Sequence, residues 1–164
     1  HDALPISIRI AILSCKIKKS NKMKKLLSIA MLGFSMISFA QDRAINYNQM
    51  PKTSQQFVNK YFGVKQVGST ILDDDYFSKE YKVYLNNGTK VEFEGNGSWK
   101  EIDGNHNAIP TGFIPAKITN YVKRSFPNTM ITKIEKDRNS IDIELNNGLD
   151  VEFDRNGNFI RIDD

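Results

Sequence analysis

The chain has 164 residues, of which 23 are Lys or Arg and 19 are Asp or Glu, and its formal net charge is +4. Seven of the basic residues and one of the acidic residues lie before residue 41, so residues 41–164 carry 16 basic and 18 acidic side chains and a net charge of −2. This balance argues against nucleic-acid or anionic-membrane binding by residues 41–164, and their lack of Cys excludes disulfide and thiolate chemistry.

Residues 1–22 do not fit the start of an exported protein. The first seven residues, HDALPIS, look like the translated end of a common sequencing adapter. We therefore interpret residues 1–22, including Cys15, as a non-native leader produced by adapter and upstream translation. The alternative is a genuine but unusual leader.

Residues 23–40 have the organisation of a bacterial signal peptide. Met-Lys-Lys at 23–25 is followed by the uncharged run Leu26–Phe39, and small residues near Ala40 suit a signal peptidase, so we expect cleavage before Gln41. The alternative is a membrane anchor, but 14 residues rise only about 21 Å as a helix, short of the roughly 30 Å hydrocarbon core. The mature protein is therefore predicted to be periplasmic or secreted, with no integral membrane segment.

The mature region, residues 41–164, contains an internal repeat. Residues 81–103 align without gaps to residues 141–163, and 11 of the 23 positions are identical. The similarity continues upstream between residues 51–62 and 115–126, which places the two repeats at 48–103 and 112–164. The first repeat is four residues longer between helix and strands, and this predicts an enlarged, charged loop around residues 73–75.

Each repeat begins with an amphipathic helix. Pro51 and Pro115 suit the first turn, because a first-turn residue has no hydrogen-bonded N–H to lose, and Gly63 and Pro127 follow the helices. Apolar residues recur at helical spacing in both copies. They are Phe57, Val58, Tyr61 and Phe62 in the first, and Ile118, Tyr121, Val122 and Phe126 in the second.

The remainder of each repeat alternates with period two, which predicts strands buried on one side. A less regular strand is expected at 64–72 and 130–136. A hairpin follows, and its Asn-Gly pair, at 87–88 in the first repeat and 147–148 in the second, favours a type I′ turn. A second turn, at 96–97 in the first repeat and 156–157 in the second, leads to the last strand. The two α-β4 repeats predict an α+β fold, with one antiparallel sheet of about eight strands, both helices on one face and the other face open.

Strand parity identifies the side chains of the open face. They are Lys82, Tyr84, Lys90, Glu92 and Glu94 in the first repeat, and Asp142, Glu144, Asp150, Glu152 and Asp154 in the second. Because like charges on neighbouring strands are unfavourable, the acidic set suggests a site for a basic partner or a cation. The alternative is a solvated face that keeps the protein soluble. The candidate contacts are Tyr84, Glu92, Asp142, Glu144, Asp150 and Glu152.

Three further features are better explained by structure than by chemistry. Residues 154–158 resemble the opening of a calcium loop, but the position of the bidentate Glu is Asp163, so turn chemistry is the preferred interpretation. Trp99 and Phe159 share a repeat position, which favours a core role over an interface anchor. His106 has no partner in the sequence pattern, and we predict no catalytic residue, metal site or cofactor.

Each repeat has a helix that begins at Pro, followed by the motif V-x-L-x-N-G-x-x-V-x-F-x-x-x-G-x-W/F, and both repeats follow a signal peptide. Over residues 48–164 this pattern resembles the PepSY-like family of exported Bacteroidetes proteins. That family is also described as β-lactamase-inhibitor-like. The resemblance implies a sheet like that of the secreted β-lactamase inhibitor protein, whose concave face grips an enzyme, although that protein's disulfides have no counterpart here.

We therefore expect an exported, non-catalytic binding module. It would bind another exported protein through its open sheet face, or inhibit it as a protein (enzyme) inhibitor. The alternative is a periplasmic small-ligand or cation binder. Inhibition itself does not follow from the resemblance, because similar folds host unrelated functions.

Overall fold

The computed structural model describes residues 42–75 and 77–163. They belong to a compact unit that spans Ala40–Asp164, and the predicted leader and signal peptide lie outside the described residues. Within the described ranges, no helix combines the length and the hydropathy that crossing a bilayer requires.

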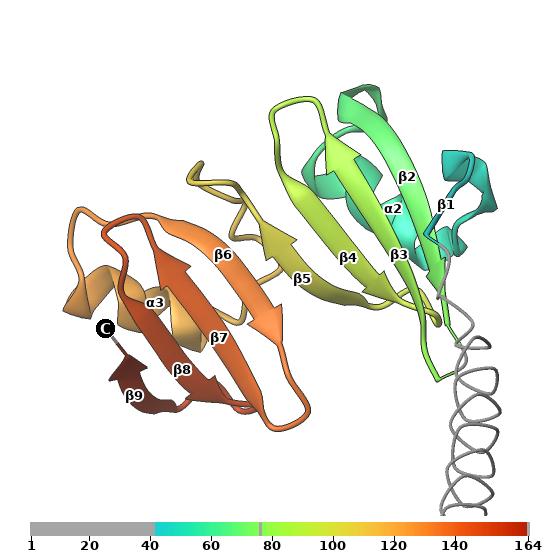
Figure 1. Cartoon of the computed structure of the whole chain (residues 1–164). Helices are drawn as coiled ribbons and strands as arrows, with labels where there is room; N and C mark the ends of the chain where they lie inside the picture. Colours follow the sequence, from blue (N-terminus) through green and yellow to red (C-terminus); the bar gives the residue numbers. More distant parts are fainter. Residues whose placement is uncertain (1–41, 76, 164) are drawn as a thin grey trace, which may run out of the picture. The chain divides into compact units, whose positions relative to one another are not determined.

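In the described residues, nine antiparallel strands form one sheet in the order of the chain (Figure 1). The strands are β1 Arg43–Ala44, β2 Val67–Asp74, β3 Lys79–Leu85, β4 Lys90–Glu94, β5 Trp99–Asp103, β6 Ile131–Lys136, β7 Ser140–Leu145, β8 Asp150–Asp154 and β9 Phe159–Asp163. The helices are α2 Lys52–Tyr61 and α3 Ala116–Ser125, with short 3₁₀ turns η1 Tyr47–Gln49 and η2 Val64–Gln66. This confirms the predicted α+β fold, to which the two-residue β1 adds a ninth strand.

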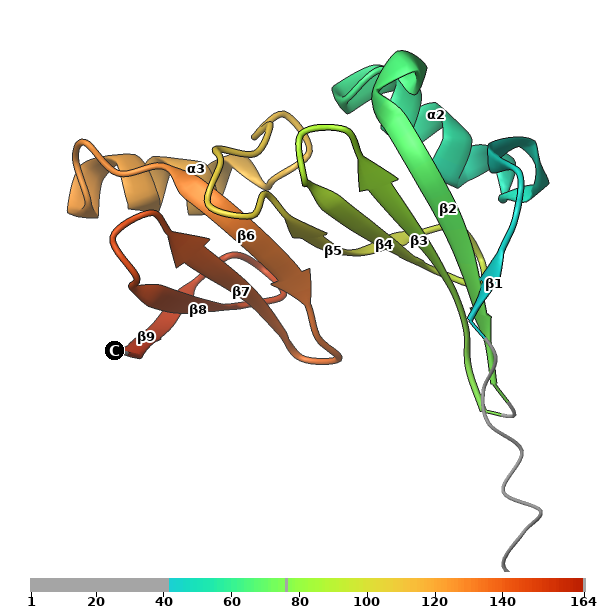
Figure 2. The same ribbon diagram turned by 45° about the horizontal axis from the view of Figure 1, so that its top comes forward.

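Both helices lie on the same face of the sheet (Figure 2). Pro51 and Pro115 occupy the N-cap position, one residue earlier than predicted, and their carbonyls accept the first helical hydrogen bonds, from the N–H groups of Gln55 and Thr119. Val58 of α2 and Ile118 of α3 are fully buried against the sheet. Within the described residues, no helix lies on the opposite sheet face.

One hydrophobic core runs beneath both helices. The halves meet where β5 pairs with β6, and there Ile102 lies opposite Ile134, with both side chains fully buried. Phe113, from the segment before α3, packs edge-on against Phe57 and Trp99 of the first repeat, with ring centroids 5.1 and 5.3 Å apart. Trp99 therefore packs against the core, as its repeat position suggested.

The prediction of type I′ hairpin turns was wrong. Gly88 and Gly148 have positive φ angles of 87° and 85°, but Asn87 and Asn147 do not have positive φ. Gly88 N–H donates to the Leu85 carbonyl and Leu85 N–H to the Thr89 carbonyl, which is a three-residue turn with glycine at the left-handed position. The Asn87 side chain instead accepts the Thr89 N–H, at 3.1 Å.

The additional residues of the first repeat do not form the predicted charged loop. Asp73 and Asp74 belong to β2, and Asp73 pairs with Lys82 of β3 at 2.7 Å, so the insertion lengthens the β2–β3 hairpin. Only Asp75 lies in the turn, where its carboxylate accepts the N–H groups of Phe77 and Ser78. Because Lys82 neutralises Asp73, strand β2 can extend through this acidic segment.

Candidate functional site on the open sheet face

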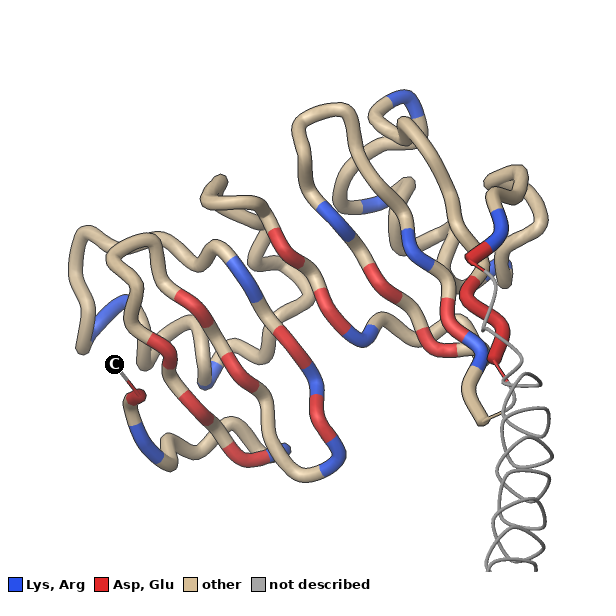
Figure 3. Tube along the Cα trace, in the orientation of Figure 1, with Lys and Arg blue, Asp and Glu red and all other residues tan. Residues whose placement is uncertain are grey.

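Charged residues recur along the strands of the sheet (Figure 3). They alternate with core residues along each strand, so their side chains lie on the open face. Strand register aligns them in two rows across β5 to β9. The first row is Glu101, Glu135, Asp142, Glu152 and Arg161, and the second row is Asp103, Lys133, Glu144, Asp150 and Asp163.

In the first repeat, lysines neutralise three acidic side chains of this face, while Glu94 and Asp103 lie within 4 Å of no Lys or Arg nitrogen of the described residues. Lys90 contacts Glu92 at 2.9 Å and Glu101 at 3.1 Å. Burial alone lowers the pKa of Lys90, but its hydrogen bonds to these two carboxylates outweigh burial and raise the pKa overall. Lys100 contacts Glu80 at 2.7 Å. Ion pairs therefore join most of the charged side chains on the first half of the open face.

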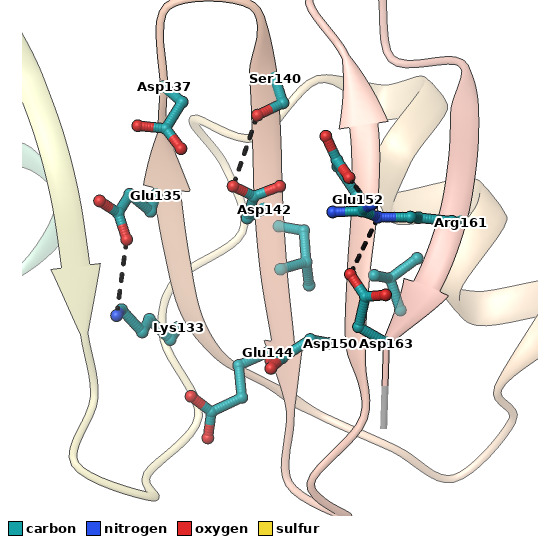
Figure 4. Close-up of a pocket in the computed structure, with 12 residues that line it drawn as sticks. Lys133, Glu135, Asp137, Ser140, Asp142, Glu144, Asp150, Glu152, Arg161 and Asp163 are labelled. Atoms are coloured by element: carbon teal, nitrogen blue, oxygen red, sulfur yellow. Dashed lines mark hydrogen bonds and ion pairs between the residues drawn. The ribbon is translucent and has the colours of Figure 1, made fainter.

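In the second repeat, the open face forms an acidic depression with a volume of about 370 Å³ (Figure 4). Seven carboxylates and two basic groups line it. The lining residues are Lys133, Glu135, Asp137, Ser140, Asp142, Ile143, Glu144, Asp150, Val151, Glu152, Arg161 and Asp163.

The two basic side chains of the depression lie at its sides. Lys133 lies 3.6 Å from both Glu101 and Glu135, and Arg161 Nε contacts Glu152 at 2.7 Å and Asp163 at 2.9 Å. Among the residues that the structure describes, four carboxylates of the depression lie within 4 Å of no Lys or Arg nitrogen. These are Asp137, Asp142, Glu144 and Asp150.

Asp142 has an acidic residue opposite it on each neighbouring strand. Register places it directly opposite Glu135 of β6 and Glu152 of β8, and Figure 4 shows it between them. Burial and the neighbouring carboxylates, led by Glu152, together raise the pKa of Asp142 to about 6, and the hydrogen bond from the Ser140 hydroxyl only partly opposes them. A cation placed over this carboxylate would relieve the repulsion and favour the charged form.

The structure brings four of the six candidate contacts together. Asp142, Glu144, Asp150 and Glu152 all line the depression. Tyr84 and Glu92 belong to the first repeat and do not line it. Tyr84 is exposed on β3, whereas Glu92 is buried beside Lys90 and is engaged by its ammonium group.

Sequence reasoning missed the contributions of the two outer strands of the second repeat. Lys133 and Glu135 flank the buried Ile134 on β6, and Arg161 and Asp163 flank Ile162 on β9. The period-two parity used for β7 and β8 also applies to these strands. It would have found all four residues.

The calcium-like segment after β8 is a turn whose carboxylate is already used. Asp154 Oδ1 accepts the N–H groups of Asn156 and Asn158, each at 2.8 Å, and Oδ2 accepts the Asn158 side-chain amide at 2.7 Å. The Asn158 side chain and backbone hold the pKa of Asp154 below its usual range. In residues 42–75 and 77–163, no group of three or more His, Cys, Asp or Glu side chains could hold a metal ion.

Comparison with known proteins gives both a family match and structural relatives. The family model described as "putative beta-lactamase-inhibitor-like, PepSY-like" matches residues 79–161. No curated protein matches the chain.

Three crystal structures of Bacteroides proteins are similar to this one. A putative calcium-regulated periplasmic protein from Bacteroides thetaiotaomicron is 36% identical, with a TM-score of 0.72, and the match covers 75% of this chain and 97% of that chain. A putative periplasmic protein from Bacteroides vulgatus is 34% identical, with a TM-score of 0.73 and coverage of 77% and 100%. A second periplasmic protein from that organism, of unknown function, is 32% identical, with a TM-score of 0.71 and coverage of 76% and 100%.

Proposed function

Since this chain belongs to the PepSY-like, β-lactamase-inhibitor-like family and is a periplasmic or secreted protein, we propose that it is a non-catalytic binding module that holds another exported protein on its open sheet face. The contact surface is the acidic depression of the second repeat. Its partner presents lysine or arginine side chains. Nucleic acids are not expected as partners, because the region from residue 41 onward has a net negative charge.

The observation that supports this proposal is the absence of basic neighbours around Asp142, Glu144 and Asp150 in the described structure. A face that served solubility alone could pair its charges, as the first repeat does with Lys90 and Lys100. The second repeat instead places like charges opposite each other, which disfavours folding. A basic partner would turn that repulsion into attraction and would also raise the rate of association.

The description of the family as inhibitor-like supports an enzyme as the partner, and it names an inhibitor rather than a catalyst. Inhibition would follow if the enzyme's basic surface borders its active site, because the bound sheet would then block substrate entry. The acidic depression provides recognition in this proposal, and the partner provides any chemistry.

Charge reversal tests the proposal. We expect the double variant Asp142→Lys/Glu144→Lys to fold but to lose capture of the partner from a periplasmic extract, because both changes place positive charge in the centre of the contact surface. The matched control is Asp74→Lys/Glu94→Lys, which makes the same change in net charge on exposed side chains of the first repeat. Capture is quantified by mass spectrometry of the bound fraction, with circular dichroism as a check of folding.

The control variant is expected to retain the wild-type partner. Equal capture by the wild-type protein and the Asp142→Lys/Glu144→Lys variant would exclude the depression as the contact surface. Equal loss in both double variants would indicate a nonspecific effect of net charge.

The second candidate function is a cation binder, which the name of the calcium-regulated Bacteroides relative favours. Because the described residues contain no preformed group of metal ligands, the carboxylates of the depression would have to move together around the ion. Calcium bound only to the native state would raise the Tm by mass action. The Tm is measured with 1–5 mM CaCl2, on the order of the affinity of extracellular calcium modules, and with MgCl2 as the control. This function is favoured over protein capture if CaCl2 raises the Tm, MgCl2 does not, and the variant Asp142→Lys/Glu144→Lys abolishes the rise.

A further inference from the structure

The last strand, β9, is the counterpart of β5 in a different environment. Strand β5 pairs with β4 as β9 pairs with β8, since Val91 lies opposite Ile102 and Val151 lies opposite Ile162. Both ladders also have a register shift at the same place, before Phe93 and before Phe153. On its other side β5 pairs with β6, whereas β9 has no second neighbour in the described part of the chain. The backbone groups on that side of β9 are therefore available for another strand.

The missing neighbour leaves apolar side chains exposed on β9. Ile102 of β5 is 0% exposed because Ile134 of β6 lies opposite it, whereas its counterpart Ile162 is 42% exposed. Phe159, the counterpart of Trp99, is 41% exposed, although it stacks on Tyr121 with ring centroids 4.9 Å apart. The predicted core role of Phe159 is thus only partly fulfilled. An additional strand beside β9 would cover the side chain of Ile162.

We propose that β9 pairs with β9 of a second copy of this chain, antiparallel and about a twofold axis through Ile162. In this register Ile162 faces Ile162 of the second copy, and Arg161 faces Asp163 of the second copy on both sides of the axis. The arrangement resembles the internal β5–β6 pairing, in which Ile102 faces Ile134 and Asp103 faces Lys133, although there the third pair, Glu101 and Glu135, carries like charges. Strand β9 is therefore complementary to itself in both shape and charge.

The described structure also argues against a head-to-tail alternative. The counterpart of β6 in the first repeat is β2, whose outer edge is already paired with β1, where Arg43 lies opposite Leu72 and Ala44 opposite Ile71. The Ile45 N–H extends this pairing by donating to the Thr70 carbonyl at 3.0 Å. A second copy would have to displace β1 to reach β2, whereas β9 is accessible without rearrangement.

The predicted contact is small, because the β5–β6 ladder that it copies joins three residue pairs. Stable interfaces usually bury more than about 1,000 Å², so we expect a weak dimer that forms at high protein concentration. Twofold pairing of β9 would place the two acidic depressions side by side on one continuous sheet. The inference depends on the edge geometry and not on the proposed binding function, and it can be tested without a partner.

Charge exchange gives a test that is specific to this register. The mass of the protein is followed by sedimentation equilibrium from micromolar to millimolar concentration at 0.15 M salt, where the Debye length of about 8 Å screens long-range repulsion. Arg161→Asp places two acidic groups opposite each other, and Asp163→Arg places two basic groups opposite each other. Each is expected to weaken dimerisation by about tenfold or more, because every dimer contains the altered pair twice.

The double variant Arg161→Asp/Asp163→Arg and an equimolar mixture of the two single variants both restore opposite charges across the axis. Both are expected to dimerise about as well as the wild-type protein. Ile162→Thr should weaken the dimer, and Val64→Thr, at an exposed apolar residue far from β9 in the sequence, should not. Circular dichroism confirms that each variant is folded.

A wild-type protein that remains monomeric at millimolar concentration would overturn the proposal. So would a dimer whose stability is unchanged by Arg161→Asp or Asp163→Arg. Oligomers larger than dimers would also overturn the twofold arrangement. If deletion of residues 42–45, which removes β1, prevented those oligomers from forming, the contact would be head-to-tail addition of β9 to β2.

Discussion

Asp142 shows how a single side chain connects the stability of this protein to its proposed binding role. It is half-buried and faces Glu135 and Glu152 on the two neighbouring strands. Its pKa of about 6, against an ordinary value of 3.8, means that the folded protein disfavours the charged form. A carboxylate that opposes folding when it is charged is stabilised by any cation that binds beside it.

The pH dependence of stability has a definite sign at this residue. Between about pH 4 and pH 6 the folded protein binds more protons at Asp142 than the unfolded chain does, so the stability falls as the pH rises through this window. We expect Asp142→Asn to raise the free energy of unfolding by about 1 kcal/mol at pH 7.5, allowing for solvent screening, and to change it little at pH 4.5. Urea denaturation at the two pH values measures the difference.

Asp74→Asn serves as the control, because Asp74 is an exposed carboxylate outside the depression. This variant should keep the wild-type difference in stability between the two pH values. If Asp142→Asn destabilised the protein equally at both pH values, the side chain would be contributing a favourable hydrogen bond rather than an unfavourable charge.

At the scale of secondary structure, the four tight hairpins share one design. In each, a glycine with positive φ closes a three-residue turn. The hairpins after β4 and β8 also contact a helix, since the Gly97 carbonyl accepts the Ser54 hydroxyl of α2 at 3.1 Å and the side chain of Lys117 of α3 bonds to Asn158. The turns therefore position the helices as well as reverse the chain.

The glycines of these turns differ in the space around them, which predicts unequal effects of alanine. Gly148→Ala should cost about 1 kcal/mol, because a Cβ there meets no atom within 4 Å and only the positive φ is unfavourable. Gly97→Ala should cost about 2–4 kcal/mol, because its Cβ would also overlap the Thr53 hydroxyl and lie 2.7 Å from Pro51 Cβ. Thermal or urea unfolding of the two variants measures the difference, and equal costs would show that the α2 contact is easily relaxed.

The sequence predicted those parts of the fold that local patterns encode. Period-two alternation identified the strands, proline and apolar spacing identified the helices, and the repeat showed that the same unit occurs twice. The turn type was wrong because Asn-Gly is compatible with more than one turn, and the choice depends on where the next strand begins pairing. Strand β1, with only Arg43 and Ala44, is too short to leave a pattern.

The candidate site was predictable in part for a similar reason. Strand parity found Asp142, Glu144, Asp150 and Glu152, since outward direction is a local property. The burial of Glu92 depends on Lys90 and on Glu101 of the next strand, and those contacts require the register between strands. Parity alone therefore did not distinguish a neutralised carboxylate from one without a basic neighbour.

At the scale of the whole molecule, the two repeats share one sheet and one core, so neither half is expected to unfold alone. Ile134 of the second repeat is fully buried against Ile102 of the first, and Phe113 packs on Phe57 and Trp99. Trp99 is the only tryptophan and lies in the first repeat, so its fluorescence reports on that half while circular dichroism reports on both.

We expect Ile134→Ala to lower the free energy of unfolding by about 2–4 kcal/mol, because it leaves a cavity at the β5–β6 junction. The midpoints measured by Trp99 fluorescence and by circular dichroism should shift together, as a two-state transition requires. Ile160→Ala, at an exposed side chain, should move neither midpoint appreciably. A shift in circular dichroism alone would show that the repeats unfold separately.

The sequential order of the strands, β1 to β9, has a consequence for how the protein folds. Each strand pairs only with strands adjacent to it in the chain, and six of the eight pairings join strands separated by a short turn. Such a topology has a low contact order, and loop closure then costs little entropy before the native contacts form. A chain that enters the periplasm with its N-terminus first can therefore begin to pair strands β2 to β5 before the second half arrives, and the common core is completed when β6 pairs with β5.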